Sequence, residues 1–222
     1  MVEASYYLLS VGVASVLLLV LRGRTAWRYI IGLGLWFSYL LVLHKSEVLQ
    51  NFDFPPRVPA LIVLPAAVLC IVLVNRKAMQ QALDATPTYL PVAIQSFRIL
   101  VELLIFATYA QGVFPQKVTF EGLNFDILVG VSAVIVSIAS FKGLIKQRGV
   151  LLWNLAGLAI LSLTMFSFVS AYYFSDFASN DNRYLLTQFP YLLLPAFLLP
   201  IAIFLHAFSI KQVWPKVAVS RE

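Results

Sequence analysis

Two charged side chains, Arg98 and Glu102, interrupt the apolar run at residues 90–113. At 100° per residue in an α-helix, Gln95, Arg98, Glu102 and Tyr109 fall within about 60° of one helix face. A charge inside a membrane costs at least about 2.5–3.5 kcal/mol on insertion scales, so such groups usually face a bundle interior or a wet cavity. The sequence therefore predicts a substrate-binding site here. In this site Glu102 would carry a proton or cation, and Arg98 would set the charge of Glu102 or meet an anionic substrate.

The same spacing supports a structural interpretation. Arg98 and Glu102 are four residues apart, so they can pair within one helix and neutralise each other. Such a pair would stabilise helix packing without binding a ligand. The sequence leaves both interpretations open.

A second group of polar residues lies at 119–126, immediately before the next apolar run. Asp126 or Asn124 can cap the following helix, and an acidic residue suits the positive end of the helix dipole. Glu121 and whichever of the other two is not the cap could then contact a cation or substrate at the outer mouth. The alternating oxygen ligands of a calcium loop are absent.

The other residue types that could do chemistry are few. We expect no metal and no cofactor, because His44 and His206 lie far apart along the membrane normal. The single cysteine, Cys70, is expected to be a buried structural thiol. With no nucleophile or metal predicted, an intramembrane enzyme that uses Glu102 as acid or base is the least favoured function.

The composition places these residues in a membrane protein. The 222 residues are 61% hydrophobic and 12% charged, with a mean hydropathy of +0.88. Soluble domains have about 45–50% apolar and about 25% charged residues, so a soluble globular protein is excluded. Disorder is excluded for the same reason. Nucleic acid is not an expected partner, because membrane topology accounts for the net charge of +6.

Seven apolar runs are long enough to cross a bilayer as helices, for which roughly 20 residues are needed. They lie near 5–21, 27–43, 58–74, 90–113, 126–145, 150–174 and 189–210. The alternating segments of about ten residues that form a transmembrane barrel are absent. The sequence thus predicts an all-α, polytopic membrane protein in which residues 1–222 form a single integral membrane domain.

The distribution of Lys and Arg predicts the orientation, because cytoplasmic loops carry an excess of both. Glu3 precedes the first run and basic residues follow it, which is the wrong polarity for a cleaved signal. The expected topology has the N-terminus outside and the C-terminus inside. Eleven basic residues then lie inside, namely Arg22, Arg24, Arg28, Arg76, Lys77, Lys142, Lys146, Arg148, Lys211, Lys216 and Arg221. Four lie outside, namely Lys45, Arg57, Lys117 and Arg183.

The runs before and after 90–113 share a pattern. Each set of three has a short basic first connection and a second connection of about 14 residues. The third run of each set starts near a proline and has another soon after, Pro59 and Pro65 in one, Pro190 and Pro195 in the other. Together with Pro200, these prolines predict bent helices. The arrangement is similar to the 3+1+3 parallel repeat of SWEET-type sugar transporters, although any 3+1+3 count gives the same helix directions.

Two segments, FRILVE at 97–102 and TFEGLNFDILVG at 119–130, resemble a bacterial family of seven-helix integral membrane proteins. The resemblance implies the bacterial inner membrane and no particular activity. Our leading hypothesis is a transporter-like protein that moves a small solute or ion through the lipid bilayer. The main alternative is a membrane subunit or sensor that binds a partner protein, and a homo-oligomer is also compatible with the sequence.

Overall fold

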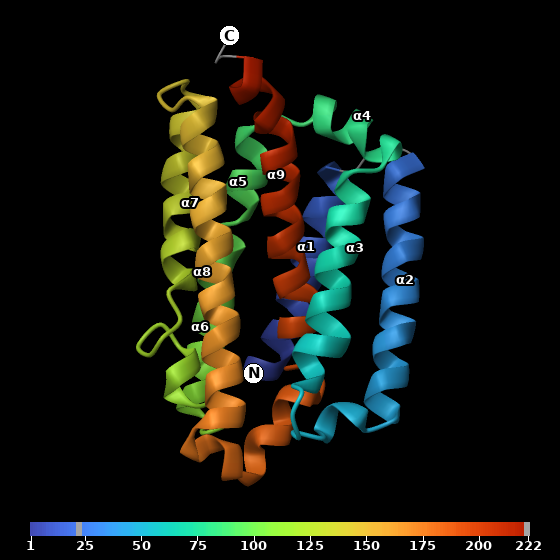
Figure 1. Ribbon diagram of the computed structural model, residues 1–222, viewed down its shortest axis with the longest axis vertical. Coiled ribbons are helices and arrows are strands. Elements are labelled where there is room, and N and C mark those ends of the chain that lie inside the picture. The colour runs from blue at the N-terminus through green and yellow to red at the C-terminus, as the bar shows by residue number, and fades with distance from the viewer. Residues whose placement is uncertain (21–23, 220–222) are drawn as a thin grey trace.

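The computed structural model describes residues 1–20 and 24–219, and every regular element in these two ranges is helical. Figure 1 shows helical rods lying side by side along the long axis of the molecule. The nine α-helices of the described residues are α1 (Val2–Val20), α2 (Arg24–Lys45), α3 (Leu64–Val74), α4 (Lys77–Ala85), α5 (Tyr89–Ile94), α6 (Phe97–Ala110), α7 (Asp126–Phe141), α8 (Gln147–Phe174) and α9 (Leu199–Val219). Arg22, Arg221 and the side chains of Arg24 and Lys216 lie outside the described residues.

Four helices in the described part of the chain are long and apolar enough to cross a membrane. They are Val2–Val20 (α1), Tyr89–Ala110 (α5 and α6 together), Gln147–Phe174 (α8) and Leu194–Pro215 (a π-helical turn and most of α9). A fifth span results if Pro59–Val74 and Met79–Ala85, which are bent by 73°, count as one. Asp126–Phe141 is apolar but has only 16 residues. The all-α prediction is thus confirmed, with four to five apolar helices that fit a membrane protein.

The connections gather at the two ends of the bundle. Residues 46–58, 111–117 and 175–193 lie at the lower end in Figure 1, which we call the loop end. The C-terminus lies at the opposite end, together with α4. This short helix was not predicted, because its sequence KAMQQALDA is too polar to stand out as an apolar run.

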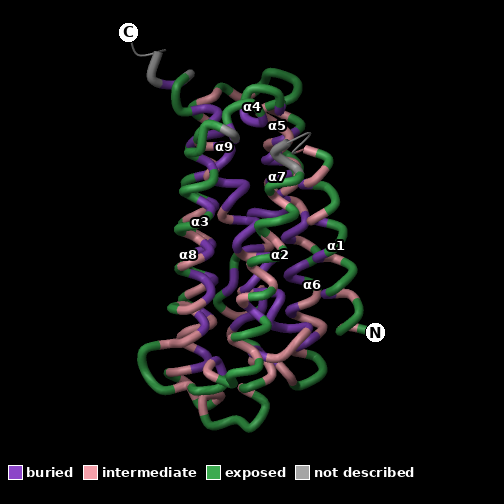
Figure 2. The backbone as a smooth tube through the Cα atoms, turned by 90° about the vertical axis from the view of Figure 1, so that its right-hand side faces the viewer, coloured by how far each residue is buried: buried purple, intermediate pink, exposed green. Residues whose placement is uncertain are grey.

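Buried residues follow the axis of the bundle, whereas exposed residues lie on its outer sides and at its ends (Figure 2). Many of the outward side chains are large and apolar, among them Leu8, Leu19, Leu35, Ile135, Leu152 and Phe166. A helix that faces lipid needs such a surface, because hydrocarbon does not penalise exposed apolar groups.

Prolines bend the chain where α3 and α9 begin, as expected. Each of these helices is preceded by one π-helical turn, Pro59–Val63 and Leu194–Leu198, and the two turns contact each other. The N–H that closes each turn belongs to the residue just before Pro65 or Pro200. A proline has no N–H and its ring clashes with the carbonyl four residues earlier, so the turn widens.

Aromatic side chains of α2 bind the two carbonyls that these prolines leave without their usual helical donor. The Tyr39 hydroxyl donates to the carbonyl of Leu61 at 2.7 Å. The Trp36 indole donates to the carbonyl of Ala196, also at 2.7 Å. Both carbonyls lie four residues before a proline, so α2 stabilises the two bends.

Candidate functional site

A buried ion pair joins α6 to α7 in the middle of the bundle. Arg98 Nε donates to Asp126 Oδ2 at 2.6 Å, and Arg98 Nη2 donates to Asp126 Oδ1. Only 1% of Arg98 is exposed. This two-bond geometry matches the planar guanidinium to the carboxylate. In the described residues the ion-pair partner of Arg98 is therefore Asp126 of α7, and not Glu102 four residues along the same helix.

Local structure brings the two partners together. Arg98 lies in the first turn of α6, after a break at Gln95 and Ser96 that divides the predicted 90–113 helix in two. Asp126 is the first residue of α7. One turn later, a Cβ atom on Gly130 would lie 2.8 Å from the backbone nitrogen of Ile99. Glycine therefore allows α7 to approach the backbone of α6 closely enough for the ion pair to form.

Arg98 also donates to a histidine of α9. Its Nη1 lies 2.9 Å from His206 Nε2, and His206 Nδ1 lies 2.9 Å from Asn154 Oδ1. Arginine has donors only, so Nε2 must accept. We infer that the ring is neutral, with its proton on Nδ1 donated to Asn154. Asn154 in turn donates to Ser209 Oγ at 2.9 Å.

A glycine of α8 makes room for this histidine. A Cβ atom on Gly157 would lie 2.7 Å from His206 Nε2, closer than real Cβ contacts allow. Gly157 is three residues after Asn154, so both lie on the same face of α8. This face of α8 therefore both leaves room for the imidazole and accepts the hydrogen bond from its Nδ1–H.

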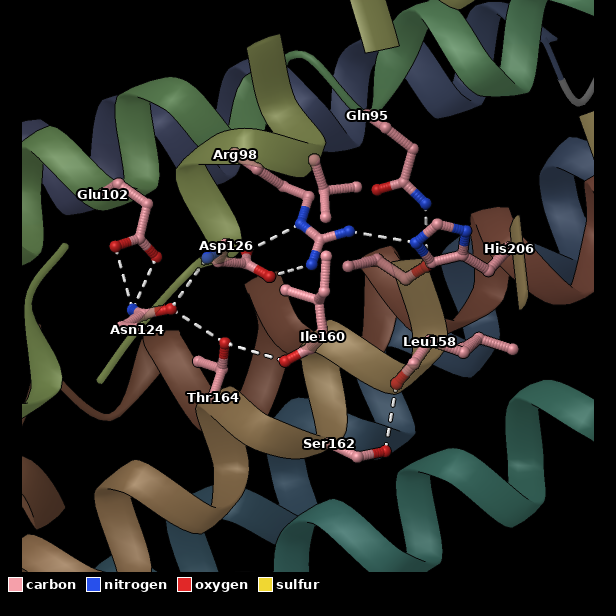
Figure 3. Close-up of polar contacts among 12 residues, drawn as sticks. Gln95, Arg98, Glu102, Asn124, Asp126, Leu158, Ile160, Ser162, Thr164 and His206 are labelled. Carbon is pink, nitrogen blue, oxygen red and sulfur yellow. Dashed lines mark hydrogen bonds and ion pairs between the residues drawn. The ribbon is translucent and has the colours of Figure 1, made fainter. Parts of the chain in front are cut away.

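Glu102 lies on the other side of the ion pair, where a single amide binds it. Asn124 Nδ2 is 2.8 Å from both oxygens of the Glu102 carboxylate. Asn124 Oδ1 accepts from Thr164 Oγ1 at 2.8 Å and from the backbone N–H of Asp126 at 3.1 Å. Figure 3 shows these contacts as a continuous series from Glu102 through Asn124, Asp126 and Arg98 to His206.

The segment before α7 enters the bundle. Val118, Thr119 and Asn124 are fully buried although they belong to a connection between helices. Asn124 Nδ2 donates to the Val118 carbonyl at 3.0 Å, and Thr119 Oγ1 donates to the Gln116 carbonyl at 2.8 Å. These local bonds satisfy backbone groups that would otherwise be unpaired in an apolar environment.

A cavity of about 80 Å³ lies beside this series of contacts. Its polar lining includes Arg98, Glu102, Asp126 and Thr164. The other lining residues are mostly aromatic or aliphatic, and they come from the loop end, the two π-helical turns, α6, α8 and α9: Phe52, Val58, Pro59, Val63, Phe97, Val101, Ile105, Leu161, Met165, Phe168, Val169, Tyr172, Tyr173, Leu186, Leu194, Pro195, Leu198, Leu199 and Ala202. The cavity is therefore apolar along most of its wall and charged at one place.

The predicted stripe on the 90–113 segment is only partly assembled. Gln95 is buried, and its Nε2 donates to the Ala202 carbonyl at 3.0 Å, but it does not line the cavity. Tyr109 is half-buried and packs against Phe106, with ring centroids 5.9 Å apart. Arg98 and Glu102 are thus the stripe residues that meet at the cavity.

Of the three predicted outer-mouth residues, one is exposed and two are buried in the bundle. Glu121 is exposed, 3.4 Å from Gln116 Nε2. Asn124 and Asp126 are buried at the ion pair and not at the outer mouth. Phe125 holds the N-cap position of α7, and Asn124 Oδ1 accepts the first N–H of that helix. Asn124 therefore satisfies the helix end and binds Glu102 at the same time.

Sequence reasoning missed two polar residues of the site, His206 and Ser209. His206 was weighed only as a metal ligand. For Asn154 the sequence left open a place in a cavity or a hydrogen bond between helices, and the structure shows hydrogen bonds to α9. The available signal was helical spacing: Asn154 and Gly157 form one polar, open face on α8, and His206 and Ser209 are also three residues apart on α9.

Within the two described ranges, no three His, Cys, Asp or Glu side chains gather closely enough to hold a metal ion. No protein-family model, curated protein or solved structure matches the chain. The candidate function therefore depends on the geometry of this site.

Proposed function

We propose that this protein is a multi-pass membrane protein that moves a small solute or ion through the bundle, with Glu102 as the group that carries the proton or cation. The proposed topology has seven spans, with the N-terminus outside and the C-terminus inside a bacterial inner membrane. It adds α2, the bent segment at 59–85 and the short α7 to the four long apolar helices.

The charges at the two ends of the bundle support this orientation. Connections and adjoining helix ends at the C-terminal end contain seven basic residues, Arg28, Arg76, Lys77, Lys142, Lys146, Arg148 and Lys211. Lys45, Arg57, Lys117 and Arg183 lie toward the loop end. With the cytoplasm at the C-terminal end, the larger basic group is inside, as the positive-inside rule requires.

The observation that carries the proposal is a buried carboxylate with one donor beside a cavity. Arg98 and Asp126 neutralise each other, and His206 is neutral as its bonds require. An ionised Glu102 is then the uncompensated charge of the group. A carboxylate can accept about four hydrogen bonds, and in the described residues Asn124 provides the donor.

A group in this situation gains stability by taking up a proton or a cation. Burial without full pairing is costly for a charge, so uptake at Glu102 removes a cost that the folded protein otherwise bears. Release of the proton or cation restores this cost, so the gain on binding is limited and the ligand can leave again. Intramembrane carboxylates of this kind serve as relays in transport. The fixed pair of Arg98 and Asp126 would hold the surroundings of Glu102 in place during the cycle.

The test measures charge movement in proteoliposomes adsorbed on a solid support. Jumps in the concentration of protons, Na⁺, K⁺ and small ammonium ions are applied to the wild type, to Glu102→Gln and to Glu47→Gln. Glu47 is exposed at the loop end, so its variant removes one carboxylate without touching the cavity. We expect a transient current for at least one cation, its loss in Glu102→Gln and its retention in Glu47→Gln. The absence of any current, or equal currents in all three proteins, would contradict the proposal.

A second candidate, a membrane subunit that binds a partner protein, is favoured by an apolar groove of about 770 Å³ between α1 and the α5–α6 segment. Ser5, Gly12 and Ser96 line it, and small residues allow helices to approach closely in membranes. Native mass spectrometry after mild extraction distinguishes the two. A stoichiometric second polypeptide would favour the subunit.

A further inference from the structure

The cavity beside Glu102 has the lining that an organic ion requires. Phe97, Phe168 and Tyr172 contribute aromatic rings to its wall, and Val101 and Leu198 contribute aliphatic groups. A purely inorganic ion has no apolar area, so it would gain no hydrophobic stabilisation from this surface. A ligand with an apolar body would gain free energy by burying its apolar area against this wall.

The sign of the charge follows from the pairing of the site. Arg98 has three of its donors bound to Asp126 and His206, so its charge is compensated. Glu102 has no basic residue bound to it among the described hydrogen bonds and ion pairs. A cation at Glu102 therefore balances the site, whereas an anion would add to the excess negative charge.

The scarcity of oxygen ligands separates organic from inorganic cations. Filters selective for K⁺ replace the hydration shell with rings of carbonyl oxygens. Here the polar oxygens along the cavity belong to Glu102, Asp126, Thr164 and two tyrosines, and the two oxygens of Asp126 are already bound to Arg98. Aromatic faces, by contrast, attract ammonium groups directly.

A tyrosine adds a donor and an acceptor without a partner. Tyr172 lines the cavity, and its hydroxyl is buried without a hydrogen-bond partner in the described part of the chain. Tyr172 is 2% exposed. Buried hydroxyls are normally hydrogen-bonded, so an unpartnered one indicates a missing partner. A ligand N–H or an ordered water would satisfy it.

We propose that the solute bound at Glu102 is a small organic ammonium ion with an aliphatic body. The proposal rests on the proposed function in one respect, since both use Glu102 as the charged group. The cavity of about 80 Å³ is roughly half the size of a ~150 Å³ cavity that accepts benzene, so the ligand has about four non-hydrogen atoms. Propylammonium and trimethylammonium have this size.

The experiment compares three probes that share a chain of three carbons and differ in charge. Binding of propylammonium, 1-propanol and propionate to the purified protein in lipid nanodiscs is measured by isothermal titration calorimetry, with NaCl and KCl as further probes. We expect saturable binding of propylammonium, at least about tenfold tighter than that of 1-propanol, because a charge-assisted hydrogen bond to a buried carboxylate is lost in the alcohol. Propionate, Na⁺ and K⁺ should not compete.

Two variants assign the binding to this cavity. Glu102→Gln should weaken propylammonium binding about tenfold or more while leaving the weak binding of 1-propanol unchanged. Val101→Phe should abolish the binding of both probes, because it fills the cavity while retaining the carboxylate. Glu47→Gln is the control and should bind as the wild type does.

Each remaining outcome overturns the inference. Equal binding of the three probes, a preference for propionate, competition by Na⁺, or no binding of propylammonium would each exclude an organic ammonium site. These results can be told apart from a failure of the proposed function. Currents with protons or Na⁺ and no ammonium binding would retain transport and reject the ligand. Ammonium binding without any current would retain the ligand and reject transport.

Discussion

Replacing Asp126 by Asn is the sharpest perturbation of the site, because it keeps the size of the side chain and removes one charge. Arg98 makes two hydrogen bonds to Asp126 and one to His206. The substitution leaves the guanidinium buried without the carboxylate that is hydrogen-bonded to it. Breaking a buried ion pair from one side costs about 3–5 kcal/mol, and hydrogen bonds to charged groups contribute about 1.5–3 kcal/mol each. We therefore expect Asp126→Asn to lower the free energy of unfolding by about 3–5 kcal/mol.

The pairing is tested by two double-mutant cycles. The first combines Arg98→Met with Asp126→Asn, and the second combines Arg98→Met with Glu102→Gln. Residues that share a hydrogen-bonded pair couple by about 0.5–3 kcal/mol, whereas independent sites are additive within about 0.5 kcal/mol. The first cycle should therefore show strong coupling, so that the double variant is more stable than the sum of the single losses predicts. The second cycle should show weaker coupling than the first, because Arg98 and Glu102 attract each other by charge but share no hydrogen bond in the described residues.

The free energy of unfolding is measured in mixed micelles by SDS titration, followed by the fluorescence of the four tryptophans. The control variant Glu47→Gln, at an exposed position, should have the same free energy of unfolding as the wild type. Stronger coupling of Arg98 to Glu102 than to Asp126 would refute the reasoning, because it would show that the charges pair within α6 as the i,i+4 spacing suggests.

Three further predictions concern the surroundings of the site. Gly157→Ala should lower the free energy of unfolding by about 1–3 kcal/mol, because its Cβ would collide with the His206 imidazole. The control is Gly32→Ala, whose Cβ meets nothing within 4 Å and should not destabilise the protein in the same SDS titration. Trp36→Phe removes the donor to the Ala196 carbonyl, which lies four residues before Pro200, and should lower the free energy of unfolding by about 1–3 kcal/mol. The control is Trp214→Phe at an exposed position, and equal free energies of unfolding for the two variants would contradict the prediction. The thiol of Cys70 is buried and donates to the Pro200 carbonyl, so a water-soluble maleimide should label it only after unfolding. Rapid labelling of the folded protein, detected by mass spectrometry, would contradict this burial.

The helices were largely predictable from hydrophobicity, and the breaks within them were not. The apolar run at 126–145 contains α7, and the run at 150–174 contains most of α8. The divided 90–113 run and the two π-helical turns depend on where carbonyls find donors across the bundle. That information lies in residues such as Trp36 and Tyr39, which are more than 20 positions away from the carbonyls they bind. A local pattern cannot show it.

The site was predictable where a charge interrupts an apolar run, as at Arg98 and Glu102. Their partners were not, because pairing depends on the path of the 118–126 segment. Connections normally lie on the surface, so Asn124 and Asp126 were expected there. The close approach at Gly130 and the local bonds of Asn124 instead bring this segment into the bundle. The partner of Arg98 is therefore 28 positions away and not four.

The two halves of the polar series differ in how fully they are satisfied, and this difference separates a structural role from a functional one. Arg98, Asp126 and His206 satisfy each other, so their substitution should mainly change stability. Glu102 receives one amide and faces a cavity, an arrangement that a purely structural carboxylate would not need. Both oxygens of Glu102 are bound, but they share one neutral amide, whereas a buried charge retained for stability is normally paired with an opposite charge and several hydrogen bonds. The incomplete shell of Glu102 is therefore the feature that a bound proton or cation best explains.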